Sequence, residues 1–149
     1  MITLKLQGFQ QAKETLIKEM DKYVETGYAT VGFHEKNNAR ADGETNAEIA
    51  MKNHFGSGNI PARPFLDVGV ESVISKMNLD AEEVLKKGGS PYKALDVMAE
   101  TAVGGVKTYI GNLYYPPNSP YTIKMKGSSH PLIATASMRQ AVSKEVHKK

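Results

Sequence analysis

The chain has 149 residues, no cysteine and a net charge of +3. This length fits one domain over residues 1–149, which would bury roughly 70% of its unfolded surface. Without cysteine there can be no disulfides, thiolate metal sites or cysteine nucleophiles. No apolar run approaches the roughly 20 residues that cross a bilayer, and the first residues do not form a signal peptide. We therefore expect a cytoplasmic location without membrane contact.

The charge is distributed unevenly along the chain. Residues 1–85 hold 9 Lys or Arg and 13 Asp or Glu, a net of −4, whereas residues 86–149 hold 10 and 3, a net of +7. Two regions of opposite charge would allow copies of the chain to bind head to tail, or allow the basic region to face nucleic acid. A solvated surface with a basic tail is the simpler interpretation, so charge alone does not decide the function.

The first two predicted elements are a strand and a helix. Residues 1–7 alternate apolar and polar side chains, which is typical of a short strand with one buried face. Over residues 9–25 the apolar positions follow a helical stripe, and Gly27 provides a stop. The members of this stripe are Phe9, Ala12, Leu16, Met20, Tyr23 and Val24.

A second strand and a long loop come next. Residues 28–33 predict a strand because β-branched Thr30 and Val31 lie at its centre, and we expect His34 at its end. Residues 35–46 are polar and rich in turn formers, so they predict a long, flexible, exposed loop.

Two further segments lead into the second half of the chain. Thr45 or Asn46 can cap a helix that extends to Phe55, with His54 facing outward near its end. Residues 59–63 are predicted to be extended, because a residue that precedes proline is disfavoured in a helix.

Two long helices are predicted after this segment. Pro64 suits the first turn of a helix over residues 64–86, which the glycines at 88 and 89 would end. A second helix begins near Ser90-Pro91 and extends to about residue 113. Gly104 and Gly105 lie in its middle, where each glycine costs about 1 kcal/mol relative to alanine, so we expect close packing against another helix.

The last third of the chain is rich in proline. Residues 114–120 predict a rigid, extended arm that cannot be a regular helix or a central strand. Residues 122–126 are weakly strand-like, residues 132–138 are ambiguous, and residues 140–146 alternate as a closing strand does. The predicted fold is α+β, an antiparallel sheet packed by two to four helices.

The residues that could carry chemistry do not form a catalytic or metal-binding pattern. No two histidines have the i, i+4 spacing of helical metal ligands, and there is no Gly-x-Ser-x-Gly elbow. The neighbouring Glu82 and Glu83 are better explained as a solvated helix face than as a catalytic pair. We therefore predict no enzyme activity, no metal and no cofactor.

Two stretches suggest more than the core of a monomer. The first is a helix over residues 46–56 followed by Ile60-Pro61-Ala62-Arg63-Pro64-Phe65-Leu66, in which Arg63 is held between two prolines. The second contains Pro116-Pro117-Asn118-Ser119-Pro120-Tyr121-Thr122-Ile123, followed by Pro131 to Thr135. A proline-rich arm suits a segment that lies over a neighbouring surface at low entropic cost.

Together with Val31-Gly32, these stretches resemble the small tail-completion, neck or minor tail proteins of tailed bacteriophages. The matching segments span roughly residues 30–140 in the order of that family. His54 stands where the family usually has glutamate, and Ala136 stands where it has a glycine after Thr135. The turn expected at Ala136 would therefore have to form without positive φ.

The resemblance implies an α+β subunit of the virion, assembled in the host cytoplasm. Copies would form a ring, commonly sixfold, between the tail tube or terminator and the head connector, with possible non-specific contact to passing DNA. The expected interface residues are Arg40, Asp42, Arg63, Pro64, Phe65, Tyr114, Tyr115, Pro117 and Tyr121.

Two alternatives remain open at this point. Within the same class, the chain could be a tail terminator or a head-closure protein. In a different class, it could be a small prophage DNA-binding or regulatory protein, since its C-terminal region is basic. The sequence lacks a recognition helix, which disfavours sequence-specific DNA binding.

Overall fold

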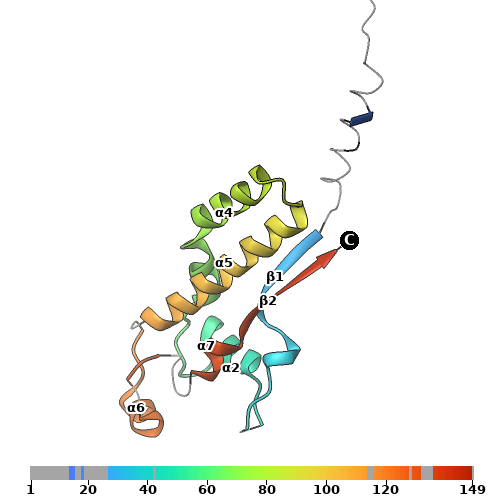
Figure 1. The fold of residues 1–149 in the computed structure, drawn as a ribbon. Helices are drawn as coiled ribbons and strands as arrows, with labels where there is room; N and C mark the ends of the chain where they lie inside the picture. The colour runs from blue at the N-terminus through green and yellow to red at the C-terminus, as the bar shows by residue number, and fades with distance from the viewer. Residues whose placement is uncertain are drawn as a thin grey trace, which may run out of the picture.

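A computed structural model describes residues 14, 15, 18, 27–41, 43–113, 116–127, 129–131 and 136–148. It combines an antiparallel pair of strands with several helices, so the α+β prediction is confirmed (Figure 1). The predicted strand over residues 1–7 lies outside the described part, as does the predicted helix over 9–25 except for residues 14, 15 and 18.

The sheet joins two segments from opposite ends of the described chain. Strand β1 (Gly27–Phe33) pairs antiparallel with β2 (Val142–Lys148), so that Gly27 lies opposite Lys148 and Phe33 opposite Val142. Strand β1 agrees with the predicted strand over 28–33. The closing strand begins later than predicted, because a short helix, α7 (Ser137–Ala141), takes up the residues before it.

The predicted loop over 35–46 is partly ordered by contacts with the helix that follows it. A 3-10 turn, η1 (Glu35–Asn37), follows β1, and the backbone carbonyl of Asn38 accepts from the backbone N–H of Asn46 at 2.8 Å. Helix α2 (Asn46–Phe55) begins with a capping box between Thr45 and Glu48, as the Thr45 prediction required.

The predicted single helix over 64–86 is wrong. The structure has two helices, α3 (Phe65–Glu71) and α4 (Ile74–Lys86), with Pro64 as the N-cap rather than the first helical residue. The break follows Ser72, whose hydroxyl donates to the carbonyl of Gly69 at 2.7 Å. Such a side-chain bond competes with the backbone hydrogen bonds of the helix and bends it. The spacing of the apolar residues alone does not reveal this break.

Helix α5 (Pro91–Asn112) is the longest of the described elements and contacts α3, α4 and both strands. The Ser90 hydroxyl caps it and Pro91 occupies its first turn, as predicted. The close-packing prediction is confirmed for Gly105, where an added Cβ would lie 2.6 Å from the Gly69 carbonyl oxygen. It is wrong for Gly104, which is exposed and faces open space.

The hydrophobic core lies where α3, α5 and β2 meet. Phe65, Val106 and Ile110 are fully buried at its centre. The remaining buried members of the cluster are Ala50, Val103, Leu113, Met138 and Val142.

The strand-like prediction for residues 122–126 is wrong, because these residues belong to helix α6 (Pro120–Lys126). Its N-cap is Ser119, whose hydroxyl accepts from the backbone N–H of Thr122, and Pro120 occupies the first turn. Gly127 ends the helix in the left-handed conformation. Residues 116–119 before it are irregular, as expected of the arm, but Pro120, the last residue of the predicted arm, belongs to the helix.

Ala136 adopts the conformation that the sequence argued against. Its φ is +59°, and among the described residues it is the only residue other than glycine with a positive φ. The turn before α7 therefore forms in the left-handed geometry, and the alanine methyl group carries the strain. The prediction that this turn forms without positive φ is wrong.

Candidate interaction surface

Arg63 connects the joint between α2 and α3 to the proline-rich arm. Its Nε donates to the carbonyl of Pro116 at 2.9 Å, and its Nη2 donates to the carbonyl of Pro117 at 3.2 Å. Its Nη1 donates to Oδ1 of Asn53, in α2, at 3.2 Å. The planar guanidinium thus joins two segments whose residues are 53 and 54 positions apart.

This arrangement changes the expected role of Arg63. The residue is only 3% exposed, and burial lowers the pKa of its guanidinium below the usual range, although it stays charged. Its charge is directed into its own chain rather than towards a neighbour. Phe65, another predicted interface residue, is fully buried in the core. Arg63 and Phe65 therefore contribute primarily to the fold of their own chain.

The other predicted interface residues are placed differently. Pro64, Pro117 and Tyr121 are exposed, and Tyr121 reaches 74%. Arg40 is half-buried, and its Nη1 donates to Oδ1 of Asn46 at 3.3 Å. The structure therefore brings Arg63 and Pro117 together and leaves Tyr121 on the outside. The remaining three, Asp42, Tyr114 and Tyr115, lie outside the described residues.

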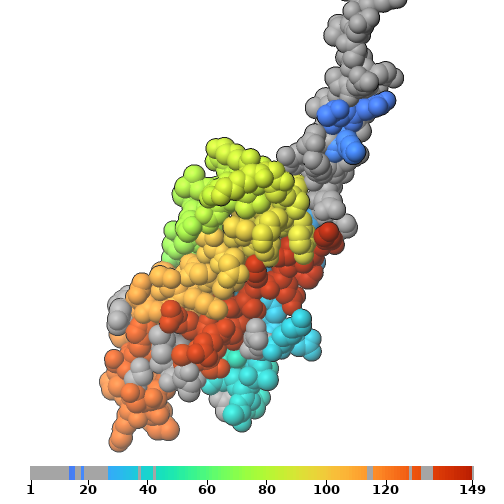
Figure 2. Space-filling view, viewed as in Figure 1, coloured from blue at the N-terminus to red at the C-terminus, as the bar shows by residue number. Residues whose placement is uncertain are grey.

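Large apolar side chains are exposed at this same end of the molecule. We call this end the arm-end surface and define it by Met51 and Phe55 of α2, Ile60 of the joint, and Tyr121 and Met125 of α6. Figure 2 shows α6, in orange, standing out from the lower end of the molecule. Phe55 is 74% exposed although it is aromatic. Aromatic and methionine side chains of this kind are enriched in protein interfaces.

A basic pocket of about 210 Å³ lies beside the Arg63 guanidinium. Asn53, Ile60, Pro117 and Lys126 contribute to its lining, which contains no acidic side chain among the described residues. The pKa of Lys126 is lowered by burial first, and then by the positive charges of Arg63 and Arg40. Because Arg63 and Lys126 both line the pocket, an anionic group would be favoured there.

His54 was predicted to face outward, and this prediction is wrong. The residue is 7% exposed, and its Nε2 lies 3.3 Å from Oδ2 of Asp67 in α3. Its ring meets those of Phe55 and Phe65 edge to face, with centroids 4.6 and 5.5 Å away. The helix turns this position inward because α3 packs beside it, a contact that the local sequence does not encode.

Asn46 is a buried polar residue that sequence analysis considered only as a possible helix cap. Its Oδ1 accepts from Arg40 and from the hydroxyl of Ser137, at 3.3 and 3.2 Å. It therefore connects α2 with α7 near the left-handed Ala136. The only signal in the sequence is its place at the start of the 46–56 motif.

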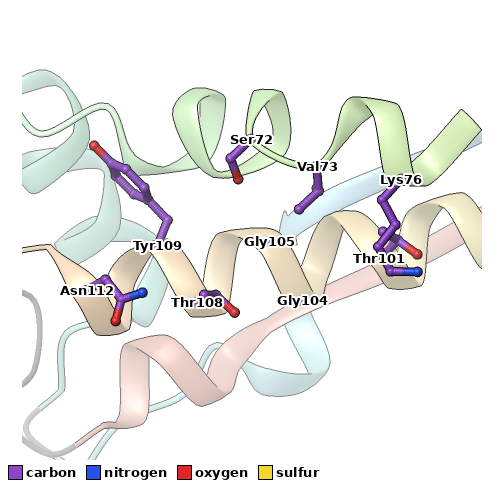
Figure 3. A pocket seen from close by; sticks show the side chains of 9 residues that line it. All are labelled: Ser72, Val73, Lys76, Thr101, Gly104, Gly105, Thr108, Tyr109 and Asn112. Carbon is purple, nitrogen blue, oxygen red and sulfur yellow. The ribbon is translucent and has the colours of Figure 1, made fainter.

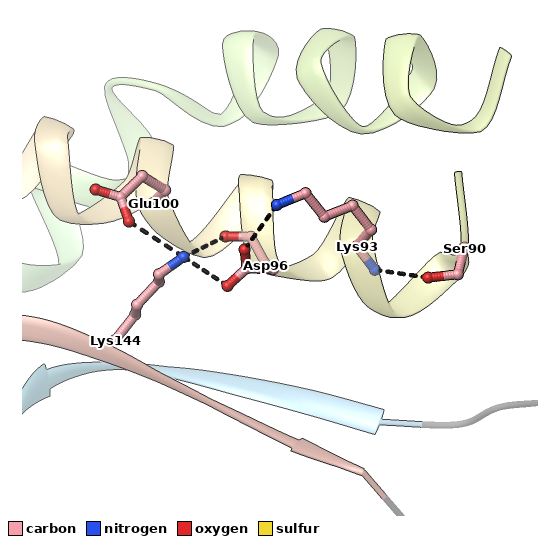
Figure 4. Close-up of polar contacts among 5 residues, drawn as sticks. All are labelled: Ser90, Lys93, Asp96, Glu100 and Lys144. Carbon is pink, nitrogen blue, oxygen red and sulfur yellow. Dashed lines mark hydrogen bonds and ion pairs between the residues drawn. The ribbon is translucent and has the colours of Figure 1, made fainter. Parts of the chain in front are cut away.

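Away from the arm end, a charged cluster fastens β2 to α5. The Lys144 ammonium bonds Asp96 Oδ1 at 2.5 Å and lies 3.1 Å from Glu100 Oε2 (Figure 4). Burial alone would lower the pKa of Lys144, but its bonds to these two carboxylates raise it. The hydrogen bond from Lys144 is in turn the main cause of the lowered pKa of Asp96.

Ser90 and Lys93 have the Ser-x-x-Lys spacing of some serine hydrolases, but they do not form a catalytic pair. The Ser90 hydroxyl accepts from the backbone N–H of Lys93 at 3.1 Å, as a helix cap. The Lys93 ammonium instead points to Asp96, 3.3 Å away (Figure 4). A lysine that activates a serine must reach its hydroxyl, and this one is paired elsewhere.

An open cleft of about 510 Å³ lies between α5 and the junction of α3 with α4 (Figure 3). Its lining is mostly apolar, and Val73, Gly104 and Gly105 contribute to it. At one end Lys76 and Thr101 both bond Asp80, whose pKa these bonds lower.

The described residues contain no group of three or more His, Cys, Asp or Glu side chains able to hold a metal ion. Of the helices in this part of the chain, none combines the length and the hydropathy needed to span a bilayer. Comparison of the sequence and structure with protein-family models, curated proteins and solved structures finds no match.

Proposed function

We propose that this chain is a non-enzymatic structural protein of a tailed-bacteriophage virion, whose copies form a ring at the head-proximal end of the tail. The observation that carries the proposal is the meeting of the family-like segments at one place. The helix over 46–56, the turn over 60–66 and the arm after Pro116 are joined by the Arg63 guanidinium.

The character of this surface supports an assembly role. Phe55 and Tyr121 are each 74% exposed, and Met125 lies on the same short helix as Tyr121. Leaving such side chains in water is unfavourable by roughly 25 cal/mol per Å² of apolar surface, so a neighbouring subunit that covers them gains stability. A ring of identical copies would supply such a neighbour at every position.

The basic pocket provides a second, complementary contact. A heterologous ring contact joins unlike patches, so a positive pocket on one copy requires an acidic group on the next. Residues 1–85, with a net charge of −4, supply acidic side chains for this role. A pocket of about 210 Å³ admits one carboxylate side chain and is too small for a DNA duplex.

The first test measures assembly of the purified chain, alone and with tail proteins of the same phage. Native mass spectrometry should give a closed oligomer, and Tyr121→Glu with Met125→Glu should shift it to monomer. Leu79→Glu is the matched control, because Leu79 is also exposed, at 64%, but lies on α4. Dissociation by the control alone, or a monomer under every condition, would contradict the proposal.

The second test asks where assembly stops. Particles made without this protein should appear in the electron microscope as filled heads and separate tails. A chain that instead remains a monomer or dimer and shifts DNA fragments in moderate salt would support the regulatory alternative.

A further inference from the structure

Arg63 is a buried cation whose hydrogen-bond partners are all neutral. Its guanidinium donates to two proline carbonyls and to the side-chain oxygen of Asn53, and within the described residues it forms no ion pair with a carboxylate. These bonds use three of its five N–H donors and leave one on each terminal nitrogen. Removing a charge from water is costly unless an opposite charge lies close to it, so this position lacks an anion.

A second cation lines the same pocket of about 210 Å³. Lys126, in the last turn of α6, contributes to the pocket wall together with Arg63. Burial is the first cause of the lowered pKa of Lys126, and the charge of Arg63 is the second. Two like charges in one small pocket repel each other, whereas an anion bound by both would be attracted to each of them.

The other polar side chains of the pocket can also donate hydrogen bonds. The hydroxyl oxygens of Ser119 and Thr122 lie 2.9 Å apart, and the bond between them uses only one of the two hydroxyl hydrogens. Asn59 adds a side-chain amide, and no carboxylate lines the pocket among the described residues. A group of donors around two cations matches the several oxygens of a phosphate or a carboxylate.

Helix α6 is the element that a bound anion would hold in place. None of its residues is buried, and Figure 2 shows it standing out from the molecule. The arm before α6 is bonded by Arg63 and by Asn118, whose amide donates to the carbonyl of His130 at 3.1 Å. An anion that contacts both Arg63 and Lys126 would connect α6 itself to the joint between α2 and α3.

We propose that this pocket binds a small oxyanion of the phosphate or carboxylate type, which bridges the Arg63 guanidinium and the Lys126 ammonium and holds α6 against the joint. The inference concerns the single chain and does not depend on ring formation. A free phosphate and an acidic side chain of a neighbouring copy would present the same kind of oxygen to these two cations.

Thermal unfolding with inorganic phosphate, against sodium chloride of equal ionic strength, tests the site. Phosphate should raise the melting temperature of the parent in a saturable way. Lys126→Gln should weaken the apparent affinity for phosphate about tenfold. The matched control is Lys124→Gln, which removes the same charge from the same helix but lies outside the pocket lining, and it should respond as the parent does.

Phosphate also stabilises proteins without binding, because it is excluded from their surface. That effect does not saturate and does not depend on one lysine. Equal, unsaturated shifts in the parent and both variants would therefore overturn the proposal.

Hydrogen exchange followed by mass spectrometry tests the connection to α6. Saturating phosphate should slow amide exchange over residues 120–127 several-fold in the parent and in Lys124→Gln, and should have no such effect in Lys126→Gln. Helix α4, at the opposite end of the molecule in Figure 1, provides the internal reference and should exchange at an unchanged rate. Saturable binding without slower exchange in α6 would contradict the claim that the anion holds this helix.

Analytical ultracentrifugation at the same phosphate concentrations distinguishes the sources of the anion. If phosphate dissociates an oligomer of the parent, a neighbouring copy supplies the carboxylate. If the oligomer persists and still shows the phosphate-dependent rise in melting temperature, the free anion is the occupant. Both outcomes support the site.

The same measurements separate this inference from the proposed function. A permanent monomer that binds phosphate through Lys126 would support the site and contradict the ring. A ring without any Lys126-dependent response to phosphate, whether assembled or dissociated by dilution, would contradict the site and leave the ring proposal intact.

Discussion

The two halves of helix α5 are packed in different ways. Its second half buries Ala102, Val103, Gly105, Val106 and Ile110 against α3 and β2, in the hydrophobic core. Its first half, over residues 91–99, buries only two alanines and leaves Leu95 and Met98 half-buried.

Helices α3 and α4, which pack against α5, differ in burial in the same way. Helix α3 buries Phe65 and Gly69, whereas the longer α4 buries no residue. Apolar contact therefore stabilises one end of the molecule, whereas ion pairs and half-buried apolar side chains characterise the other. The stability of the described fold should depend mainly on the first end, and substitutions at the two ends can test this.

The largest effect is expected at Arg63. Arg63→Ala removes three hydrogen bonds and leaves the carbonyls of Pro116 and Pro117 without their donor. We expect the free energy of unfolding to fall by about 3 kcal/mol in urea titrations. Lys126→Ala, which removes an exposed cation of the same pocket, should change it by less than about 0.5 kcal/mol. Equal effects would mean that Arg63 does not fix the arm.

The next effect separates two adjacent glycines of α5. Gly105→Ala forces a methyl group against the Gly69 carbonyl and Val73, and should lower stability by about 2 kcal/mol. Gly104→Ala faces open space and should raise it by about 1 kcal/mol, because alanine is the better helix former. Thermal unfolding of both variants would measure the difference, and effects of the same sign would contradict the packed crossing of α3 and α5.

A smaller effect is expected in the less packed half, at Asp96. The bond with Lys144 lowers the pKa of Asp96 below its ordinary value of 3.8. Its contribution to stability is therefore complete when the pH is above 3.8, and it is lost as the pH falls through the lowered pKa. Asp96→Asn should therefore cost up to about 1 kcal/mol at neutral pH. In urea titrations the variant and the parent should converge once the pH lies below the lowered pKa of Asp96. A difference that persists there would contradict an ionic cause.

The smallest effect on stability is expected at Ala136, which lies at the packed end of the molecule. Ala136→Gly relieves the left-handed strain but adds freedom to the unfolded chain, so we expect a net gain of about 0.5 kcal/mol. Ala62→Gly, at an exposed position without positive φ, should instead lower stability. Calorimetry of both variants would measure this contrast, and a loss for Ala136→Gly would indicate that its methyl group makes a needed contact.

Sequence reasoning succeeded where the cause is local. Thr45 as a cap, the Ser90-Pro91 helix start and the strand around Val31 depend on neighbours within one turn, and all three are confirmed. The close packing of Gly105 was also predicted, although the sequence did not distinguish it from Gly104. Which face of α5 contacts α3 is decided by tertiary packing and not by the local sequence.

Two of the failures have a long-range cause. His54 is inside because Asp67 and Phe65 arrive from another helix, and the guanidinium of Arg63 is satisfied by carbonyls of the distant arm. The strand-like residues after Tyr121 became helical because the Ser119 cap outweighed a weak alternation. For the candidate surface, the motifs did not reveal which side chains are exposed.

The pairing of β1 with β2 has a consequence for the order in which the molecule can fold. His34 bonds the hydroxyl of Ser143, 109 positions later, so the sheet closes one of the longest loops of the chain. Closing a long loop is entropically unfavourable until other contacts have shortened it, and contacts of high sequence separation form slowly. During synthesis, the α3–α5 crossing can form first, while β1 waits without a partner until residues 142–148 have been made. A chaperone that binds unpaired strand edges would therefore act on β1 before residues 142–148 have been synthesised.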